Sequence, residues 1–428
     1  LIQTYNPHHN ILQQVSTNNY VEMFNEQMND RYNFKYPPIY KQIKITLKHK
    51  DYNRVETASI WLAKFFYAEK DYDQTEMLLK EYISKTNSKK PNQLDEAKTL
   101  KAQIDQYREL FKNTVPFNPV KVEGASSKDD EYLPMLSPDN QFLFFTRKSI
   151  VDTKSIYGEQ EQELFIQSRK KYDGTFSNGI PMPTPFNKGS YQGGTSISVD
   201  NKLLFITIVT QEFTRDGRSF SNGDIYYSDF YDGNWSDLKS IGSHINGQFT
   251  WEGQPSISAD NQTLYFASAR GKDNLGGMDL YMTTMDGSSW GPPINLGARI
   301  NTEGSEIFPY YDSNSQRLYF GSNGHVGLGG LDIYYLDDKG DDQFGDVINM
   351  GYPLNTISDD FGIIFGEEGK EGYFTSDREG GVGRDDIYAF RKSAATMEIL
   401  VIDEATGEPI PGATVKNDCT GTEMLTNT

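Results

Sequence analysis

The chain has 428 residues, a length that predicts two or three domains, and 13% of them are aromatic. Its formal net charge of −19 disfavours nucleic acids and anionic headgroups as partners, because phosphate binding requires a positive surface. The single cysteine, Cys419, excludes an internal disulfide framework, and the sequence lacks the run of roughly 18 apolar residues that a membrane-spanning helix needs.

The first part of the chain has a helical pattern. Glycine is absent before Gly124, in contrast to the glycine-rich sequence that follows. Residues 58–79 have the spacing of two amphipathic helices joined by a tight Glu-Lys-Asp-Tyr turn, and residues 37–50 and 94–111 predict flanking helices. A single helical pair needs neighbours to bury its faces. We therefore expect an α-helical array over residues 1–113, with a generic helical bundle as the alternative.

A repeated pattern of 54 to 61 residues dominates the middle of the chain. Each copy has a polar turn such as Ser198-Val199-Asp200-Asn201, then an apolar strand core, then a Gly-rich loop followed by an acid, an aliphatic and an aromatic residue. The strand cores end at Phe145, Phe205, Phe266, Phe320 and Phe374. Such short strands at regular spacing predict an all-β propeller with five blades over residues 114–392.

The two ends of the repeat region complement each other. The segment 117–123 resembles the closing element of a copy but precedes the first copy, while the fifth copy ends at Phe390 without that element. A radial array has an unpaired edge unless its ends are joined. We therefore expect the strand near residues 117–123 to complete the fifth blade, with a stacked, open arrangement as the alternative.

One acid recurs at the same place in all five copies. These residues are Glu163, Asp224, Asp279, Asp332 and Asp386. An acid beside a Gly-Gly turn can accept backbone N–H groups and fix the loop. Five equivalent copies favour this structural role over a calcium or ligand contact, which stays the alternative.

The last 36 residues change pattern again. Residues 397–403 predict a strand, and residues 404–415 predict a turn and a second strand. About 30 residues are too few for an independent core. We therefore expect residues 393–428 to be the start of a β-sandwich that continues in a longer natural protein.

No catalytic, cofactor-binding or metal-binding constellation stands out. The five histidines, His8, His9, His49, His244 and His325, are scattered, and no nucleophile elbow or phosphate-binding loop is present. The acid pairs Asp359-Asp360 and Asp385-Asp386 could suggest a glycosidase, but adjacent residues on a strand point to opposite faces. The sequence therefore predicts no catalytic residues, no cofactor and no metal, and a protein that is not an enzyme.

Aromatic residues support a second hypothesis, a propeller that binds or cleaves glycans. Trp235, Trp251 and Trp290, with many tyrosines, could stack on sugars. Trp235 and Trp290 stand at equivalent places in the closing segments, where packing is the competing role.

Three motifs resemble known families. The repeat, with Ser-x-Asp-Asn, Leu-Tyr-Phe-x-Ser and Gly-Gly-x-Asp-Ile-Tyr, resembles the TolB-like and WD-like propeller repeats of bacterial envelope proteins. Residues 58–79 resemble a tetratricopeptide unit, apart from Thr75 where that family prefers Ala, and residues 403–415 resemble the carboxypeptidase-regulatory-like fold. This order of modules is similar to Bacteroidota periplasmic proteins of the OmpA/PorE class.

That resemblance implies a function without catalysis. Proteins of the class carry an OmpA-like, peptidoglycan-binding domain beyond these modules, and a lipidated cysteine often precedes the mature chain. We therefore expect a periplasmic scaffold at the inner face of the outer membrane, with subunits of a type IX secretion or outer-membrane protein assembly complex as partners. A glycan-binding propeller of the cell envelope is the alternative.

Overall fold

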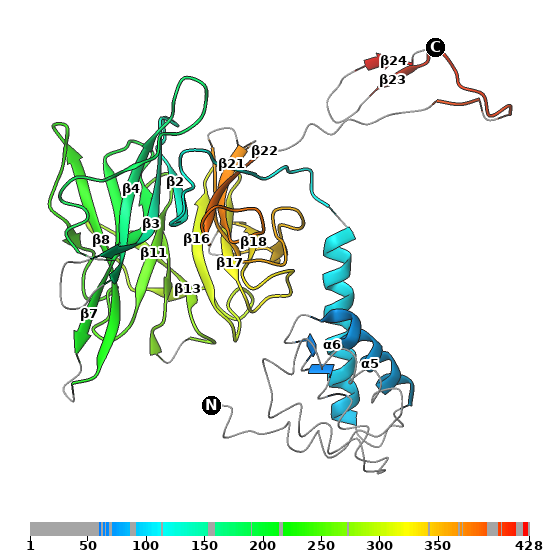
Figure 1. The fold of residues 1–428 in the computed structure, drawn as a ribbon, viewed down its shortest axis with the longest axis horizontal. Helices are drawn as coiled ribbons and strands as arrows, with labels where there is room; N and C mark the ends of the chain where they lie inside the picture. Colours follow the sequence, from blue (N-terminus) through cyan, green and yellow to red (C-terminus); the bar gives the residue numbers. More distant parts are fainter. Residues whose placement is uncertain are drawn as a thin grey trace.

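The computed structural model describes residues 60, 63–64, 66–67, 71–85, 91–112, 114–391 and 401–426, with short gaps at 153–158, 190, 214–216, 272–273, 341–342, 367–368, 370, 404 and 417–422. Antiparallel sheets make up most of the secondary structure in the described residues, and those of the propeller are drawn from cyan to orange in Figure 1. In the described part of the chain, no helix has the length and apolar character needed to cross a membrane.

The sheets form the five blades of a propeller, which confirms this part of the sequence prediction. The first blade contains β2 (Asp130–Leu136), β3 (Phe142–Asp152), β4 (Glu159–Arg169) and β5 (Ile180–Pro181). The second contains β6 (Gln192–Ile197), β7 (Leu203–Phe213), β8 (Ser219–Tyr231) and β10 (Lys239–Ser240), with β9 (Asn234–Trp235) also paired to β8. The third contains β11 (Glu252–Ile257), β12 (Thr263–Ser268) and β13 (Asp279–Asp286), and both β14 (Ser289–Trp290) and β15 (Ile294–Asn295) pair with β13.

The last two blades follow the same order. The fourth contains β16 (Glu306–Asp312), β17 (Arg317–Ser322), β18 (Asp332–Asp337) and β19 (Ile348–Asn349). The fifth contains β20 (Asp360–Phe365), β21 (Glu371–Ser376) and β22 (Asp386–Arg391), and its fourth strand is β1 (Val120–Lys121), which comes from the start of the propeller.

Strand β1 joins the two ends of the propeller. Val120 pairs with Ala389 and Lys121 with Tyr388, and the amide of Val122 donates to the carbonyl of Ile387 at 2.9 Å. This is the segment for which the sequence predicts such a pairing. The pairing gives β22, otherwise an edge strand, a partner for its backbone groups.

The first strand of each blade lies at the centre of the propeller. These inner strands, β2, β6, β11, β16 and β20, neighbour one another in a closed ring. Each contains a β-bulge, and a residue at or beside each bulge has a left-handed backbone with φ between +55° and +63°. These residues are Leu133, Gly194, Gln254, Phe308 and Gly362. The left-handed region costs a residue with a side chain about 1–2 kcal/mol, so three of the five bulges carry backbone strain.

The repeated strand aromatics form the core between blades. Phe145, Phe205, Phe266, Phe320 and Phe374 are all buried. In three blades this phenylalanine contacts the tyrosine of the acid-aliphatic-aromatic motif on the next strand, for example Phe320 and Tyr334 at 5.8 Å between ring centroids. Burying such a side chain contributes about 1.5–3 kcal/mol each.

An asparagine near the end of four blades pairs with the backbone of the third strand. These residues are Asn187, Asn246, Asn301 and Asn355. The side-chain oxygen of Asn355 accepts the amide of Ile333 at 2.8 Å, and its nitrogen donates to the Ile333 carbonyl, also at 2.8 Å. The asparagine therefore continues the backbone hydrogen bonding where the short fourth strand has ended.

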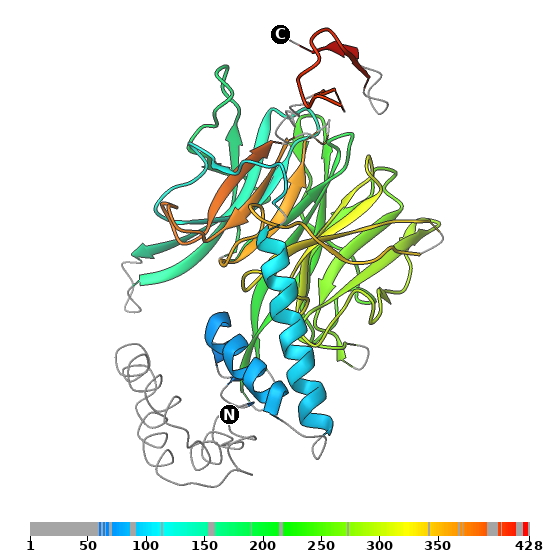
Figure 2. The same ribbon diagram turned by 90° about the vertical axis from the view of Figure 1, so that its right-hand side faces the viewer.

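The expected tetratricopeptide array is wrong for the described residues. They contain α5 (Tyr72–Lys85) and α6 (Pro91–Lys112), which pack against each other beside the propeller (Figure 2), and helical residues at 60, 63–64 and 66–67. The physical reason is that α6 is followed by the propeller rather than by another helical pair. Phe111, near the end of α6, lies 5.5 Å from the ring of Tyr352, and the amide of Val115 donates to the Tyr352 carbonyl. The helix expected at residues 37–50 falls outside the described residues.

The expected start of a β-sandwich at the C-terminus stays a prediction, and most of the strand expected at residues 397–403 lies outside the described residues. The described residues after the propeller contain one two-stranded sheet, β23 (Thr414–Lys416) and β24 (Glu423–Leu425), and a bridge between Ile402 and Pro409. A sandwich needs a second sheet to cover the first, so these strands are at most a part of such a fold.

Candidate functional site

The five acids singled out by the sequence lie on the third strand of each blade: Asp279, Asp332 and Asp386 begin it, and Glu163 and Asp224 lie inside β4 and β8. In three blades the acid accepts backbone amides from the preceding Gly-rich loop. Asp279 accepts the amide of Leu275 at 2.9 Å, Asp332 accepts that of Gly329 at 2.8 Å, and Asp386 accepts that of Val382 at 2.6 Å. Glu163 bonds to the hydroxyl of Tyr132, and Asp224 has a long contact of 3.5 Å with Asn222.

Two of these acids have strongly raised pKa values. Burial raises the pKa of Asp332 to about 6, against the opposing effect of the amides that it accepts. Burial also raises the pKa of Asp224 to about 6, assisted by the negative charges of Glu252 and Glu212. Burial raises the pKa of Glu163.

A second set of polar residues lies at the start of the inner strands. Glu131, Glu252, Glu306 and Asp360 are fully buried, and Gln192 takes the same position in the second blade. Each of these side chains accepts the backbone amide of a residue four or five positions earlier, and in the third to fifth blades it also accepts the hydroxyl of the serine that ends the second strand.

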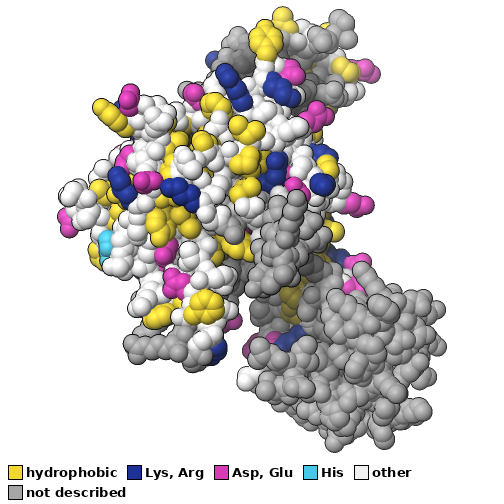
Figure 3. Space-filling model, turned by 60° about the vertical axis from the view of Figure 1, so that its left-hand side comes forward, with side chains coloured by type: hydrophobic (Ala, Val, Ile, Leu, Met, Phe, Trp, Pro, Cys, Tyr) yellow, Lys and Arg dark blue, Asp and Glu magenta, His cyan; other side chains and the backbone are white. Residues whose placement is uncertain are grey.

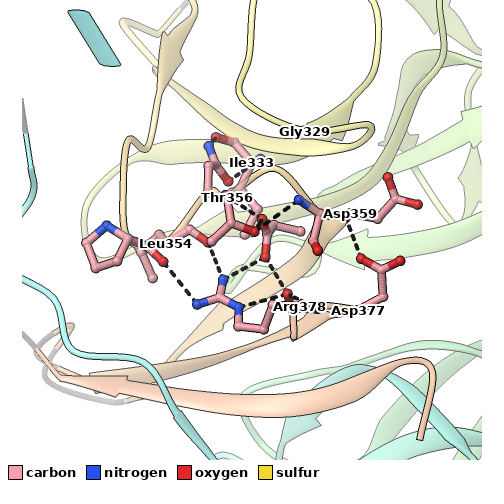
Figure 4. Close-up of polar contacts among 12 residues, drawn as sticks. Gly329, Ile333, Leu354, Thr356, Asp359, Asp377 and Arg378 are labelled. Carbon is pink, nitrogen blue, oxygen red and sulfur yellow. Dashed lines mark hydrogen bonds and ion pairs between the residues drawn. The ribbon is translucent and has the colours of Figure 1, made fainter. Parts of the chain in front are cut away.

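The fifth blade shows the bonding of this position in full (Figure 4). Arg378 lies 2.6 Å from Oδ1 of Asp360, and its guanidinium also donates to the carbonyls of Pro353 and Leu354. The hydroxyl of Ser376 donates to the same carboxylate oxygen at 2.6 Å. The Asp360 carboxylate is therefore fully committed to hydrogen bonds within the fold and is not available to a substrate.

The residue before each inner-strand acid defines a different ring, which we call the axial ring. Its members are Asp130, Tyr191, Trp251, Ser305 and Asp359, and all are half-buried. Each approaches the loop or strand of the preceding blade. Ser305 accepts the amide of Met278 at 3.2 Å, Asp359 accepts that of Leu331 at 2.8 Å, and Asp130 accepts that of Arg384 at 3.1 Å. The axial ring therefore lies at the end of the propeller where the inner strands begin, between neighbouring blades.

One side of the axial ring is acidic. Asp130 and Asp359 come from the first and fifth blades, which ring closure makes neighbours, and Asp377 lies beside them because its carboxylate accepts the amide of Asp359 at 2.7 Å (Figure 4). Asp385 lies in the same group, because its backbone carbonyl accepts the backbone amide of Glu131 at 2.8 Å. Burial raises the pKa of Asp385 to about 6, and the charges of Asp130 and Asp377 add to the effect.

The other side of the axial ring is aromatic. Trp251 and Tyr191 come from the third and second blades, which are neighbours. The indole of Trp251 lies directly over glycines, since a Cβ on Gly223 would be 2.2 Å from its Nε1 and a Cβ on Gly253 would be 2.6 Å from its ring. The side chains of Trp235 and Trp290 instead pack against phenylalanines, Trp235 against Phe230 and Trp290 against Phe205.

The remaining candidates from the sequence have structural contacts. His244 bonds to the carbonyl of Trp290 and His325 to that of Ile300, while His8, His9 and His49 fall outside the described residues. In the part of the chain that the structure describes, no group of three or more His, Cys, Asp or Glu side chains is arranged to hold a metal ion. The side chains of Asp359 and Asp360 have different partners, because adjacent residues in an extended chain point to opposite faces. The two carboxylates therefore do not form a catalytic pair.

The axial ring could not be predicted from the sequence pattern, because its members differ in residue type. Aspartate, tyrosine, tryptophan and serine show no common pattern at one repeat position. A signal was nevertheless present, since each member directly precedes the acid or glutamine that starts an inner strand. Aligning the copies on that residue, instead of on the strand aromatics, would have placed the five together.

Comparisons with known proteins give structural neighbours only. No family model matches the chain, and no curated protein matches it. A thermostable family-43 glycoside hydrolase has a TM-score of 0.41 at 10% identity, over 68% of this chain and 98% of its own. The mannose phosphorylase MPT-4 from Leishmania mexicana has 0.40 at 12% identity, over 68% and 93%. The Bacillus subtilis arabinanase Arb43A has 0.38 at 13% identity, over 63% and 96%.

These comparisons bear on two expectations from the sequence. The described residues form a five-bladed propeller, and these neighbours are named as enzymes, which runs against the expectation that this chain is not one. None of the neighbours named above is a tetratricopeptide or OmpA-like secretion scaffold, so the comparisons give that expectation no support. With TM-scores below 0.5, the likeness assigns no activity to this chain, and a functional argument has to come from its own residues.

Proposed function

We propose that the axial ring binds carbohydrate and that the acidic side of the ring supplies proton transfer for hydrolysis of a glycosidic bond. The observation that carries this proposal is the division of the ring, with two aromatic residues on adjacent blades and carboxylates on the other side. Sugars present apolar C–H faces and polar hydroxyl edges, so they suit a site that offers both an aromatic surface and carboxylate acceptors.

The position of Trp251 supports the binding step. A ring held over Gly223 and Gly253 has little rotational freedom, so stacking a sugar on it costs little conformational entropy. Tyr191 on the neighbouring blade extends the aromatic side. Asp130 and Asp359 accept one backbone amide each, and a carboxylate has further lone pairs that can accept sugar hydroxyls.

The pKa of Asp385 supports the chemical step. A carboxyl with a pKa of about 6 is partly protonated near neutral pH and can donate a proton to a leaving oxygen. Glycoside hydrolysis typically uses one protonated and one ionised carboxyl group, kept in different states by their environments. Asp385 fits the role of the proton donor, and Asp130 and Asp377 lie close enough to influence its charge.

The test is glycan-array binding with the full chain, followed by an assay for release of reducing sugar from each bound glycan. Trp251→Ala should weaken binding about tenfold or more, since a buried tryptophan is a typical source of binding energy. Asp385→Asn should leave binding intact and remove hydrolysis, because the amide cannot donate its proton as an acid. Trp235→Ala serves as the matched control, because that tryptophan packs against Phe186 and Phe230 and is not a member of the axial ring.

Two outcomes would count against the proposal. If the wild-type chain retains no glycan, the binding step is wrong. If Asp385→Asn hydrolyses as fast as the wild type, binding stands and the proposed acid is wrong.

The envelope setting inferred from the sequence is a separate proposal. Location in the periplasm, at the inner face of the outer membrane, and partners in an envelope complex are supported only by the resemblance of the repeat motifs. Fractionation of cells, with a pull-down of the full-length protein from mildly solubilised envelopes, tests both. Recovery of the protein in the cytoplasmic fraction would contradict the setting without affecting the glycan proposal.

A further inference from the structure

A cavity of about 440 Å³ occupies the axis at the end opposite the axial ring. It is lined by residues from all five blades, beginning at the left-handed bulge residues and ending at the polar turns after the inner strands. The bulge residues form its inner end, where Leu133 approaches Gly362 and Phe308 is close to the ring of Phe361 at 4.8 Å. The cavity has the size of a small-molecule site.

The mouth of the cavity is formed by the repeated turns of the sequence. Ser137 and Ser258 each donate to the aspartate two residues later and accept the amide that begins the second strand, at 2.9 Å in both cases. Asn140, at the mouth, has a left-handed backbone. These hydrogen bonds fix the shape of the turns that surround the opening.

The lining is uncharged over most of its surface. Its residues include prolines, aromatic rings and aliphatic side chains, and none is a lysine, arginine or histidine. Its one acid, Asp312, bonds within its own turn to the amide of Asn314 and the hydroxyl of Ser315. A charged ligand would lose its hydration in this cavity and find no counter-ion, so an anion is disfavoured.

Two serine hydroxyls on the inner strands can contact a ligand. Ser196 accepts the amide of Ile257 at 3.0 Å, and Ser256 accepts that of Tyr311 at 2.8 Å. A hydroxyl that accepts a hydrogen bond still carries a proton to donate. Both hydroxyls therefore favour a ligand with oxygen acceptors.

We propose that this axial cavity is a second binding site, for an uncharged organic molecule with an apolar ring system and carbonyl, ether or hydroxyl oxygens. The site is separate from the axial ring, so it does not depend on the glycan proposal. Its ligand differs in class from a glycan, because aromatic rings and prolines contribute to the lining and its one carboxylate, Asp312, is bonded within its own turn.

The test is a fluorescence titration of the full chain with Nile red, an uncharged dye that has fused rings and oxygen acceptors. We expect saturable binding of one dye per chain. The anionic dye anilinonaphthalene sulfonate should bind at least about tenfold more weakly, because the cavity offers no cation. Asp385→Asn, at the other end of the axis, should not change Nile red binding.

Two tryptophan substitutions locate the bound dye. Ala259 lies at the mouth and is exposed, so Ala259→Trp should fold normally and weaken Nile red binding about tenfold by filling the opening. Ile180→Trp adds the same ring at an exposed position on β5, outside the cavity, and should leave binding unchanged. Circular dichroism checks that both variants are folded.

Three results would overturn the proposal. These are failure of Nile red to saturate at one site, equal affinity for the anionic dye, and unchanged binding by Ala259→Trp.

Discussion

Arg378, in the loop after β21, and Asp360, at the start of β20, form an ion pair of 2.6 Å in the fifth blade. The carboxylate is fully buried, and the arginine is largely so. Burial raises the pKa of Asp360 in spite of the arginine, the serine and the threonine that bond to it. The pair thus keeps a charge inside the propeller that would otherwise be costly, and it ties β20 to the end of the fourth blade through the Leu354 carbonyl.

Arg378→Ala should destabilise the propeller by about 3–5 kcal/mol, because it leaves a buried carboxylate without its partner. Urea unfolding, followed by tryptophan fluorescence, measures the loss. Arg384→Ala is the control, since that arginine is exposed and should change the free energy of unfolding by less than about 0.5 kcal/mol. Equal effects of the two substitutions would mean that the Asp360 pair contributes little.

Asp385 should make stability depend on pH in a defined window. Its pKa is raised from 3.8 to about 6 in the folded chain, first by burial and then by Asp130 and Asp377. The folded state therefore binds the proton more tightly than the unfolded state. The contribution is fully present below pH 3.8 and is lost as pH rises through about 6, by roughly 1–2 kcal/mol because solvent screens a half-buried carboxyl.

The measurement compares the wild type with Asp385→Asn in urea between pH 4 and pH 7.5. The variant lacks the titrating group. The free energy of unfolding of the variant, relative to that of the wild type, should therefore increase as pH rises. Asp224 and Asp332 also have raised pKa values, but they titrate in both proteins and cancel in the difference. A difference that stays constant across this window would show that Asp385 titrates normally.

The propeller could be predicted from the sequence because its determinants are local and repeated. Each copy has an aromatic residue at the end of its strand core, such as Phe374, and most have a polar turn such as Ser258-Ala259-Asp260-Asn261. These features recur at similar intervals, and each copy encodes the same hairpins. The prediction of a helical array was wrong for the opposite reason, because the partner of a helix is not determined locally. A face of α6 looks the same in sequence whether it packs on another helix or, as Phe111 does, on Tyr352 of the propeller.

The candidate site was less accessible to sequence reasoning. Acids that recur, such as Asp332, can be recognised in the sequence, whereas the five members of the axial ring are of four different residue types at one repeat position. The bulges at Leu133 and Phe308 also have no local sequence signal, because bulky residues disfavour the left-handed backbone that they adopt. Only the closed ring of inner strands brings these residues to one axis.

Asn355→Ala should destabilise the fourth blade by about 1–3 kcal/mol, because the amide and carbonyl of Ile333 lose their partner in a buried position. Thermal unfolding should show a lower midpoint. Asn234→Ala is the control, since that asparagine is exposed and bonds only within its own turn. A midpoint equal to that of the wild type would mean that water replaces the asparagine.

The closure of the propeller by β1 should be testable at Val122. Its amide donates to the Ile387 carbonyl and its side chain is buried among residues of the first and fifth blades. Val122→Pro removes the donor, since proline has no N–H and fits poorly inside a paired strand. Val122→Ala keeps the N–H and removes only side-chain contacts, so the two variants separate the hydrogen bond from the packing.

Hydrogen exchange is the appropriate measurement because opening of the propeller at β1 is local. In Val122→Pro we expect the amides of β22 and β21 to exchange faster than those of β12 in the third blade, since an unpaired edge exposes the fifth blade first. Val122→Ala should lower stability evenly, by about 1–2 kcal/mol, without this gradient. If β22 stays as protected in the proline variant as in the alanine variant, the fifth blade is held by its neighbours rather than by β1. In that case the bonding between Asp130 and the Arg384 amide, which also joins the first and fifth blades, becomes the next position to test.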